Sequence, residues 1–138
     1  MDCIFCKIIA GEIPAEKIYE DREVFAFLDI NPVAPGHTLV IPKKHYVMMT
    51  DVPDKLLRHC FVKTKALMTK IKKALKADYV SVSVSGVDIP HFHIHLIPRH
   101  FNDNLKGWPT KTYPEGEIEK VTKKIIKIVI PSEVEESN

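Results

Sequence analysis

The first half of the chain alternates hydrophobic and polar residues in a way that predicts short strands. Residues 17–20 and 24–29 flank the polar stretch Glu20–Glu23, which is typical of a β-hairpin. The segment 31–36 holds two prolines and a glycine and is expected to be a loop, and the β-branched run 38–41 predicts a buried strand. A short helix over residues 2–10, ended by Gly11, is expected before the hairpin.

A longer period marks two helices. Between residues 54 and 76, apolar residues recur at helical spacing and form one stripe, made of Leu57, Phe61, Met68, Ile71 and Leu75. Most lysines of this segment lie off the stripe and are expected on a solvated face. Residues 117–129 predict a second helix that ends before Pro131, and residues 131–138 are expected to be a tail.

The second half of the chain predicts two further strands. Residues 79–85 alternate valine with serine, which indicates a strand with one polar face, and 86–90 form a turn. The next segment alternates three histidines, His91, His93 and His95, with apolar residues, so a strand would place these histidines on one face. Together the pattern predicts an α+β fold with an antiparallel sheet of about five strands, one long helix and a C-terminal helix.

Composition narrows the class of protein. The 138 residues suit a single domain over 1–138, and a formal net charge of +2 gives no reason to expect a DNA or RNA partner. Apolar runs stay well below the ~18 residues that cross a bilayer, so no membrane span is expected. The first residues do not resemble a signal peptide, and we therefore expect a cytoplasmic protein. Separately, no organic cofactor is expected.

The histidine segment has two chemical interpretations. Histidines two residues apart on one face can converge on a metal ion that activates water, as in zinc hydrolases. Alternatively, one neutral imidazole can itself attack phosphorus near neutral pH and later leave again, because its ordinary pKa is about 6.5. Three alternating histidines contribute little to packing, so we expect a chemical role for them.

Two of the three cysteines form the motif Cys3-x-x-Cys6. In a reducing compartment this spacing favours metal binding or redox chemistry over a structural disulfide. A thioredoxin-like role requires a strand before the motif, and only two residues precede Cys3. Two untethered thiols are a third interpretation. Cys60 falls inside the long helix and is expected to be a buried apolar residue.

The sequence HFHIHLI, which begins at His91, resembles the His-φ-His-φ-His-φ-φ signature of the histidine triad (HIT) family of nucleotide hydrolases and transferases, where φ is an apolar residue. Three other segments resemble family blocks in the family's order: CIFCKIIAGEIPA from Cys3, FAFLDINP from Phe25 and PGHTLVIPKKH from Pro35. The resemblance covers about residues 1–100 and is to zinc-bearing, bacterial-type members.

The resemblance implies a nucleotide hydrolase in which His93 is the nucleophile. His93 would attack the α-phosphorus of a nucleoside phosphoramidate or a dinucleoside polyphosphate and form a covalent nucleotidyl-histidine, and water would release the nucleoside monophosphate. His95 and His37 resemble the family's phosphate-side histidines, which donate hydrogen bonds to the phosphoryl oxygens. The attacking imidazole needs an anchor on its other nitrogen so that one tautomer is held.

The resemblance also implies a nucleoside site. Asp29 matches the family's ribose-binding carboxylate, which can accept hydrogen bonds from both ribose hydroxyls. A turn-capping role is the plainer interpretation of this residue. The apolar base cleft would be formed by Ile4, Phe5, Ile8, Phe27 and Ile30, each of which could instead be an ordinary core residue.

A structural zinc site is the third implication. In zinc-bearing family members the residues equivalent to Cys3, Cys6, His45 and His91 hold one ion. Two cysteines and two histidines make a closed tetrahedral ligand set, so this zinc would be structural and would join the N-terminal segment to the sheet.

The chain departs from the family pattern just before the histidines. Many members carry Gly-Gln-Ser/Thr-Val there, whose amide and hydroxyl contact the phosphates and the leaving group, whereas this chain has Val87 and Asp88 in place of the amide and the hydroxyl. Val87 cannot donate a hydrogen bond, and an ionised Asp88 would repel a phosphate unless it points away. One of the serines in the segment 79–85 could replace the missing donor.

Two other functions compete with the hydrolase. One is a nucleotide-binding module with little turnover, and the other is a zinc-dependent hydrolase that uses His91 and His93 as ligands of a catalytic metal. Family members usually pair, so a homodimer is expected. Trp108 lies in the irregular stretch 101–114, which could close over the site or pack on a neighbouring subunit.

Overall fold

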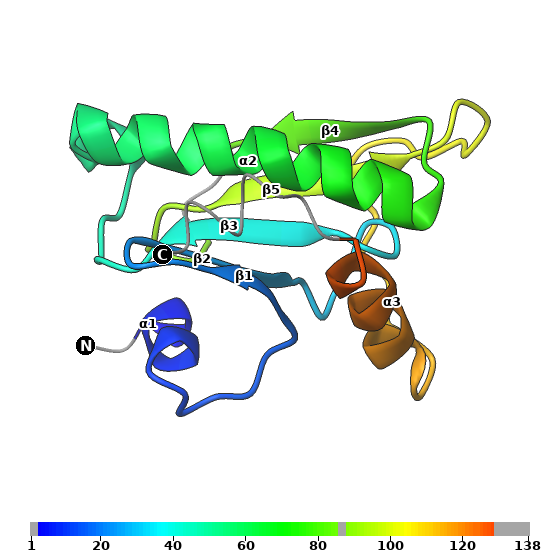
Figure 1. Cartoon of the computed structure of the whole chain (residues 1–138), viewed down its shortest axis with the longest axis horizontal. Helices are drawn as coiled ribbons and strands as arrows, with labels where there is room; N and C mark the ends of the chain where they lie inside the picture. The colour runs from blue at the N-terminus through cyan, green and yellow to red at the C-terminus, as the bar shows by residue number, and fades with distance from the viewer. Residues whose placement is uncertain (1–2, 86–87, 129–138) are drawn as a thin grey trace.

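The computed structural model describes residues 3–85 and 88–128. Within them, one antiparallel sheet has the strand order β1-β2-β3-β5-β4 (Figure 1). The strands are β1 (Lys17–Glu20), β2 (Val24–Leu28), β3 (Thr38–Pro42), β4 (Tyr79–Ser83) and β5 (Ile94–Arg99). The helices are α1 (Ile4–Ile9), α2 (Asp54–Leu75) and α3 (Glu117–Ile126), with a 3₁₀ helix, η1 (Met49–Asp51), before α2. The expected α+β fold with a five-stranded antiparallel sheet is confirmed.

The sheet is covered on both faces, and its central strands therefore alternate between two apolar cores. Helices α2 and α3 pack on one face, and α1 packs on the other (Figure 1). The side chains of β2 and β3 that face α2 and α3 are Val24, Ala26, Leu28 and Val40. Those that pack with Phe5 of α1 are Phe25, Phe27, Leu39 and Ile41. Burial of each large side chain contributes about 1.5–3 kcal/mol.

The buried side of α2 is displaced from the expected stripe. Ile71 is fully buried, as expected, but the other four stripe residues are half-buried and lie along the margin of the core. The residues at its centre are Leu56, Cys60, Thr64 and Leu67. Because α3 packs beside α2 as well as the sheet, the buried face is wider than a single stripe. Cys60 is buried, as expected.

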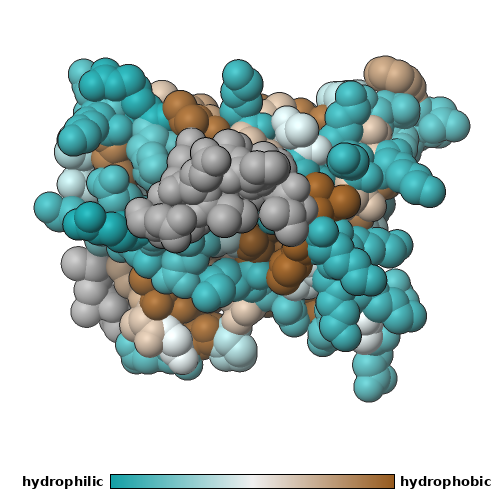
Figure 2. Space-filling view, in the orientation of Figure 1, coloured by the Kyte–Doolittle hydropathy of each residue, from teal (hydrophilic) through white to brown (hydrophobic). Residues whose placement is uncertain are grey.

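Two lysines of α2 contradict the expected solvated face. Lys63 and Lys70 are 1% and 7% exposed. A lysine stem can pack along apolar surface, and Lys63 Nζ lies 5.6 Å from the centroid of the Tyr19 ring. The remaining lysines of the segment are exposed, and Figure 2 shows mainly hydrophilic residues over the upper, α2 part of this face.

Strand β4 is shorter than expected and its valines are not all covered. It pairs with β5 from Tyr79 opposite Arg99 to Ser83 opposite His95. Val80 is buried, whereas Val82 and Val84 are each 41% exposed, because β4 is the edge strand of the sheet.

The expectation that all three histidines lie on one strand is wrong, because β5 begins at Ile94. The backbone N–H of His91 donates to the carbonyl of Ile89, and that of Phe92 donates to the carbonyl of Tyr46 at 2.6 Å. Because of these bonds, the N–H groups of residues 91 and 92 do not pair with a neighbouring strand of the sheet. The apolar residues of the segment are buried as expected, and the histidines are buried too.

Helix α3 ends at Ile126, before the expected residue 129. The expected tail and its Pro131 lie outside the described residues. None of the helices in the described ranges combines the length and the apolar character needed to cross a lipid bilayer.

Candidate functional site

Four histidines gather where β3 and β5 lie side by side. His37 directly precedes β3, and His93 directly precedes β5. His91 lies three residues before β5, and His95 is its second residue. None of the four is more than 8% exposed. Buried imidazole nitrogens need hydrogen-bond partners, so these partners define the tautomer of each ring.

His93 is held by its own backbone. Its Nδ1 atom lies 2.7 Å from the carbonyl oxygen of His91, which can only accept, so Nδ1 carries the proton and donates. In the neutral ring the other nitrogen, Nε2, then carries a lone pair. The edge of the Phe5 ring packs against His93 with the ring centroids 5.3 Å apart. The sequence-based requirement of an anchored imidazole is thus met by a main-chain carbonyl two residues away.

His37 and His95 form a chain of hydrogen bonds with a defined direction. The backbone N–H of Val33 donates to His37 Nδ1 at 3.0 Å, so a neutral His37 carries its proton on Nε2. His37 Nε2 lies 2.9 Å from His95 Nδ1 and donates to it. His95 therefore carries its own proton on Nε2, where it is available as a donor to a bound group.

Burial keeps both of these rings neutral. Burial, followed by the nearby His95 and His93, lowers the pKa of His37 to about 3. Burial and the charge of His93 likewise lower the pKa of His95 to about 4, against a smaller opposing effect of Asp88. At neutral pH the pair therefore acts as neutral hydrogen-bond donors with fixed tautomers.

Trp108 lies against these two rings, a contact that the sequence did not predict. Its ring centroid is 4.8 Å from that of His95 and 5.8 Å from that of His37, both in edge-to-face geometry. The stretch that carries it is tied down by the bond from Lys111 N–H to the Pro32 carbonyl. The irregular stretch thus covers the histidines of its own chain, and the only available sequence signal was a lone tryptophan between Gly107 and Pro109.

An apolar cavity of about 180 Å³ lies beside His93 and α1. It brings together all the residues that the resemblance assigned to the base cleft, namely Ile4, Phe5, Ile8, Phe27 and Ile30, and it also includes Asp29. Phe5 and Phe27 are each 3% exposed and also serve the core, whereas Ile30 is 65% exposed at the rim. Sequence reasoning missed other wall residues, among them Ile13, Pro14, Leu39 and Ile89.

Asp29 stands at the end of β2, between the cavity and the histidines. Its Oδ1 accepts a hydrogen bond from the Asn31 N–H at 2.9 Å, and its Oδ2 lies 3.8 Å from His37 Nε2. Burial raises its pKa, against the opposing effect of the Asn31 bond. Oδ1 therefore caps the turn, as the plainer interpretation expected, and Oδ2 is directed toward His37.

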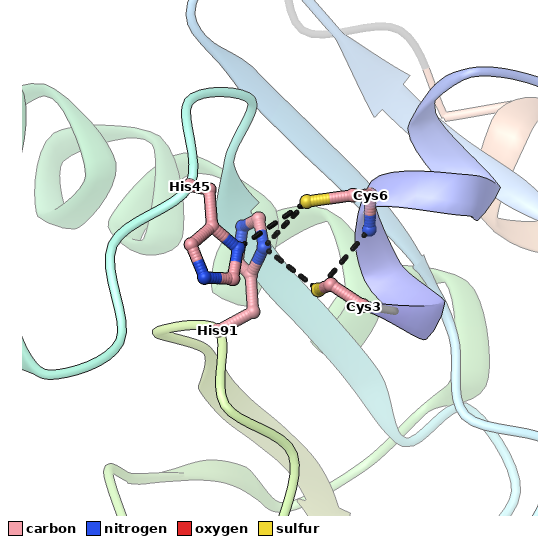
Figure 3. A group of neighbouring side chains, drawn as sticks. All are labelled: Cys3, Cys6, His45 and His91. Atoms are coloured by element: carbon pink, nitrogen blue, oxygen red, sulfur yellow. Dashed lines mark hydrogen bonds between the residues drawn. The ribbon is translucent and has the colours of Figure 1, made fainter. Parts of the chain in front are cut away.

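A second group, of two cysteines and two histidines, forms where α1 meets the sheet (Figure 3). Cys3 is the N-cap of α1, and its Sγ accepts the Cys6 N–H at 3.4 Å, so the Cys-x-x-Cys motif itself begins the helix. His45 comes from the loop after β3, and His91 comes from the segment before β5. Residues far apart in the sequence thus converge on one point.

The geometry of this group fits a tetrahedral zinc ion. His91 Nδ1 lies 3.4 Å from Cys3 Sγ and 3.5 Å from Cys6 Sγ, and His45 Nδ1 lies 3.3 Å from Cys6 Sγ. Ligands on a tetrahedral zinc with ordinary Zn–S and Zn–N bonds would be about 3.5 Å apart. His91 Nε2 donates to the Pro42 carbonyl at 2.8 Å, which leaves Nδ1 free to coordinate and supplies the usual outer partner of a metal-bound histidine.

Of the two residues that depart from the family pattern, the structure describes only Asp88. Val87 lies outside the described residues, and Asp88 is exposed. The charge of Asp88 nevertheless adds to the raised pKa of Asp29 and opposes the lowering of the His95 pKa, so its carboxylate is close enough to affect the site. His100 lies at the other end of β5, with its Nδ1 atom 3.8 Å from Asp78, and takes no part in this group.

Comparison with known proteins identifies the family. The model of the HIT domain matches residues 10–102. The chain belongs to the histidine triad (HIT) family. A crystal structure of a zinc-bound histidine triad family protein from Mycobacterium smegmatis superimposes with a TM-score of 0.82 at 31% identity and covers 92% of each chain.

Two relatives carry names that describe an activity. Adenosine 5'-monophosphoramidase HNT1 of Saccharomyces cerevisiae is 36% identical over 131 residues, which are 90% of this chain and 80% of the relative. Adenylylsulfatase HINT3 of Arabidopsis thaliana is 40% identical over 109 residues, which are 75% of this chain and 55% of the relative.

Proposed function

We propose that this HIT-family protein is a nucleotide hydrolase in which His93 bonds transiently to the α-phosphorus of the substrate. The observation that carries the proposal is the hydrogen bond from His93 Nδ1 to the His91 carbonyl. It leaves the Nε2 lone pair of a neutral imidazole free for attack, near an apolar cavity that is also lined by Asp29. The names of the yeast and Arabidopsis relatives support substrates that carry an adenylyl group.

The reaction has two displacement steps at phosphorus. In the first, a bond forms between His93 Nε2 and the α-phosphorus while the bond to the leaving group breaks. The leaving group departs with the bonding pair and takes a proton from solvent. In the second, water attacks the phosphorus, loses its proton to solvent and releases His93 as a neutral imidazole. The product is a nucleoside monophosphate, and phosphoramidates and dinucleoside polyphosphates are the substrates that we propose.

The neighbouring residues have separate roles in this proposal. His95 Nε2–H donates to a phosphoryl oxygen, and His37 fixes the tautomer of His95 through the bond between their rings. Asp29 accepts hydrogen bonds from the ribose hydroxyls. The base lies in the cavity between α1 and β2, lined by Ile4, Phe5, Ile8, Phe27 and Ile30.

We also propose that a structural zinc ion is held by Cys3, Cys6, His45 and His91, as in the zinc-bearing members of the family. All four ligand atoms lie within 4.8 Å of one another, and the chemistry of the set suits zinc. The ion would tie α1 to the sheet. Because α1 carries Phe5 and Ile8, the ion would indirectly support the nucleoside cavity.

A catalytic metal on His91 and His93 is disfavoured by the geometry. Both ring nitrogens of His91 are engaged, one with Pro42 and the other with the two cysteines. His93 Nδ1 is engaged with the main chain. A nucleotide-binding module with little turnover remains the competing function, and an assay for product formation distinguishes it from a hydrolase.

The test is an incubation of the purified protein with an adenosine phosphoramidate and, separately, with a diadenosine polyphosphate. Each is run with and without a chelator and beside His93→Ala. A hydrolase of the proposed kind forms AMP regardless of brief chelation and loses this activity in the variant. Binding without product would favour the binding module, and immediate loss on chelation with an intact fold would favour a catalytic metal.

We propose, finally, that the protein pairs as a homodimer. Strand β4 is an edge of the sheet, and large apolar side chains are exposed along it and just after β5, including Tyr79, Val82 and Phe101. Light scattering of the purified protein would measure the mass directly, and a monomeric mass of about 15.8 kDa would contradict this.

A further inference from the structure

The pairing of β4 with β5 brings the serines of the segment 79–85 close to the histidines at the start of β5. Ser81 pairs with Ile97 and Ser83 pairs with His95. Ser85 and His93 each lie two residues beyond the Ser83–His95 pair, just outside the two strands, and an extension of this register would place them beside each other. Residues opposite each other in an antiparallel pair share a face of the sheet, with their Cβ atoms about 4.5–5.5 Å apart.

A cavity at the end of these strands supports this placement independently. Ser85 and His93 both line a cavity of about 140 Å³. Its other walls are Val47, Met48, Met49, Val84 and Phe92. None of these five side chains carries an N–H or O–H donor, so among the described residues that line the cavity Ser85 provides the hydroxyl donor beside His93.

The Ser85 hydroxyl is also available for a ligand. Ser85 is exposed, and within residues 3–85 and 88–128 its hydroxyl makes no hydrogen bond. The Ser81 hydroxyl, four residues earlier on the same face, donates instead to the Ile97 carbonyl at 3.4 Å. By residue type, Val87 and Asp88 offer no such donor, because a valine side chain is apolar and an ionised aspartate only accepts.

We propose that the Ser85 hydroxyl donates a hydrogen bond to one non-bridging oxygen of the phosphoryl group while that group is transferred to and from His93. This inference rests on the proposed hydrolase function and adds to it a second donor, which comes from just beyond the end of β4, beside His93. Ser85 forms and breaks no covalent bond and keeps its proton. Its contribution is to stabilise the charge that develops on the phosphoryl oxygens.

The experiment compares the two phosphorothioate diastereomers of the adenosine phosphoramidate, in which sulfur replaces one or the other non-bridging oxygen. For the oxygen substrate, Ser85→Ala is expected to lower kcat/KM about 100-fold, the effect of removing one oxyanion donor. For one diastereomer the same variant is expected to cost little, because sulfur has already weakened the bond from Ser85. For the other diastereomer the full loss remains. A merely structural role would lower both equally.

Control variants of neighbouring serines, together with the unmodified protein, make the result decisive. Ser81→Ala and Ser83→Ala remove hydroxyls from the same face and are expected to leave kcat/KM within a few-fold of the original, and Ser85→Thr is expected to retain activity. Equal loss on both diastereomers, or full activity of Ser85→Ala while His93→Ala is inactive, would overturn the role of Ser85 and leave the hydrolase standing. No turnover by the unmodified protein would overturn both.

Discussion

The carbonyl that anchors His93 belongs to His91, whose own Nδ1 faces Cys3 and Cys6. The proposed nucleophile and the proposed zinc centre therefore share one short stretch of backbone. The imidazole of His91 is fixed by Pro42 on its other side. A zinc ion at this point would hold the His91 backbone, and with it the direction of the His93 ring.

Removal of a cysteine ligand tests the zinc centre. Cys3→Ser is expected to abolish stoichiometric zinc and to lower the melting temperature by about 10 °C, which corresponds to a few kcal/mol for a chain of this size. Elemental analysis and calorimetry measure the two effects. Cys60→Ala is the control, because Cys60 is buried in α2 away from the metal group and its loss should leave the zinc content unchanged. A metal-free protein with an unchanged melting temperature would contradict the zinc centre.

Asp29 is expected to bind the ribose through hydrogen bonds from its hydroxyls. Asp29→Asn keeps an acceptor for the Asn31 N–H but weakens the bonds to the ribose hydroxyls. Since hydrogen bonds to a charged group contribute about 1.5–3 kcal/mol, kcat/KM should fall about 10- to 100-fold for a ribonucleoside substrate. The 2',3'-dideoxyribose analogue lacks both hydroxyls and should show little difference between the two proteins. An equal loss on both substrates would show that Asp29 acts through the structure alone.

The neutral His37 ring makes stability depend on pH. Its pKa is about 3 in the folded protein and about 6.5 when the chain is unfolded. Between these values the unfolded state binds more protons, so the contribution of His37 is fully present above pH 6.5 and is lost as the pH falls toward 3. His37→Asn, which keeps an acceptor for the Val33 N–H, should show a shallower loss of unfolding free energy between pH 6.5 and 4. Urea unfolding measures this free energy at each pH. If its pH dependence were the same in both proteins, the neutral buried ring would be contradicted.

Asp21 is expected to stabilise the β1–β2 turn. Burial raises its pKa, but hydrogen bonds from the Glu23 N–H, Tyr19, His59 and the Val24 N–H outweigh this and lower it below the ordinary value. Asp21→Asn should therefore cost about 1–3 kcal/mol of unfolding free energy. Glu23→Gln removes an exposed charge two residues away and should change stability by less than about 0.5 kcal/mol. Equal small effects in thermal unfolding would remove Asp21 from this role.

Periodicity predicted the strands and helices well but not their ends. The alternation around His91 and His93 is that of a strand, yet Phe92 bonds to Tyr46, which is 46 residues away in the chain. Local sequence contains no signal for such a long-range bond. The stripe on α2 is displaced for a similar reason, because the width of the buried face depends on where α3 packs.

The candidate site was predictable where residue type limits the chemistry. Two cysteines and two histidines have few shared roles, and the structure brings all four together. The contact of Trp108 with His95 was not predictable, because irregular segments have no period from which to infer their neighbours. The position of Ser85 beside His93 required the folded structure, because alternation alone leaves the register of neighbouring strands open.

The most direct test of the account is to trap the bond between His93 and phosphorus. The protein is mixed with an adenosine phosphoramidate labelled at the α-phosphorus, quenched in base within one turnover, and mapped by mass spectrometry, because a phosphorus–imidazole bond breaks readily in acid. We predict one adenylyl group on His93, absent from His93→Ala and lost on acidification. Full turnover by His93→Ala, or a label on another residue, would contradict the central claim.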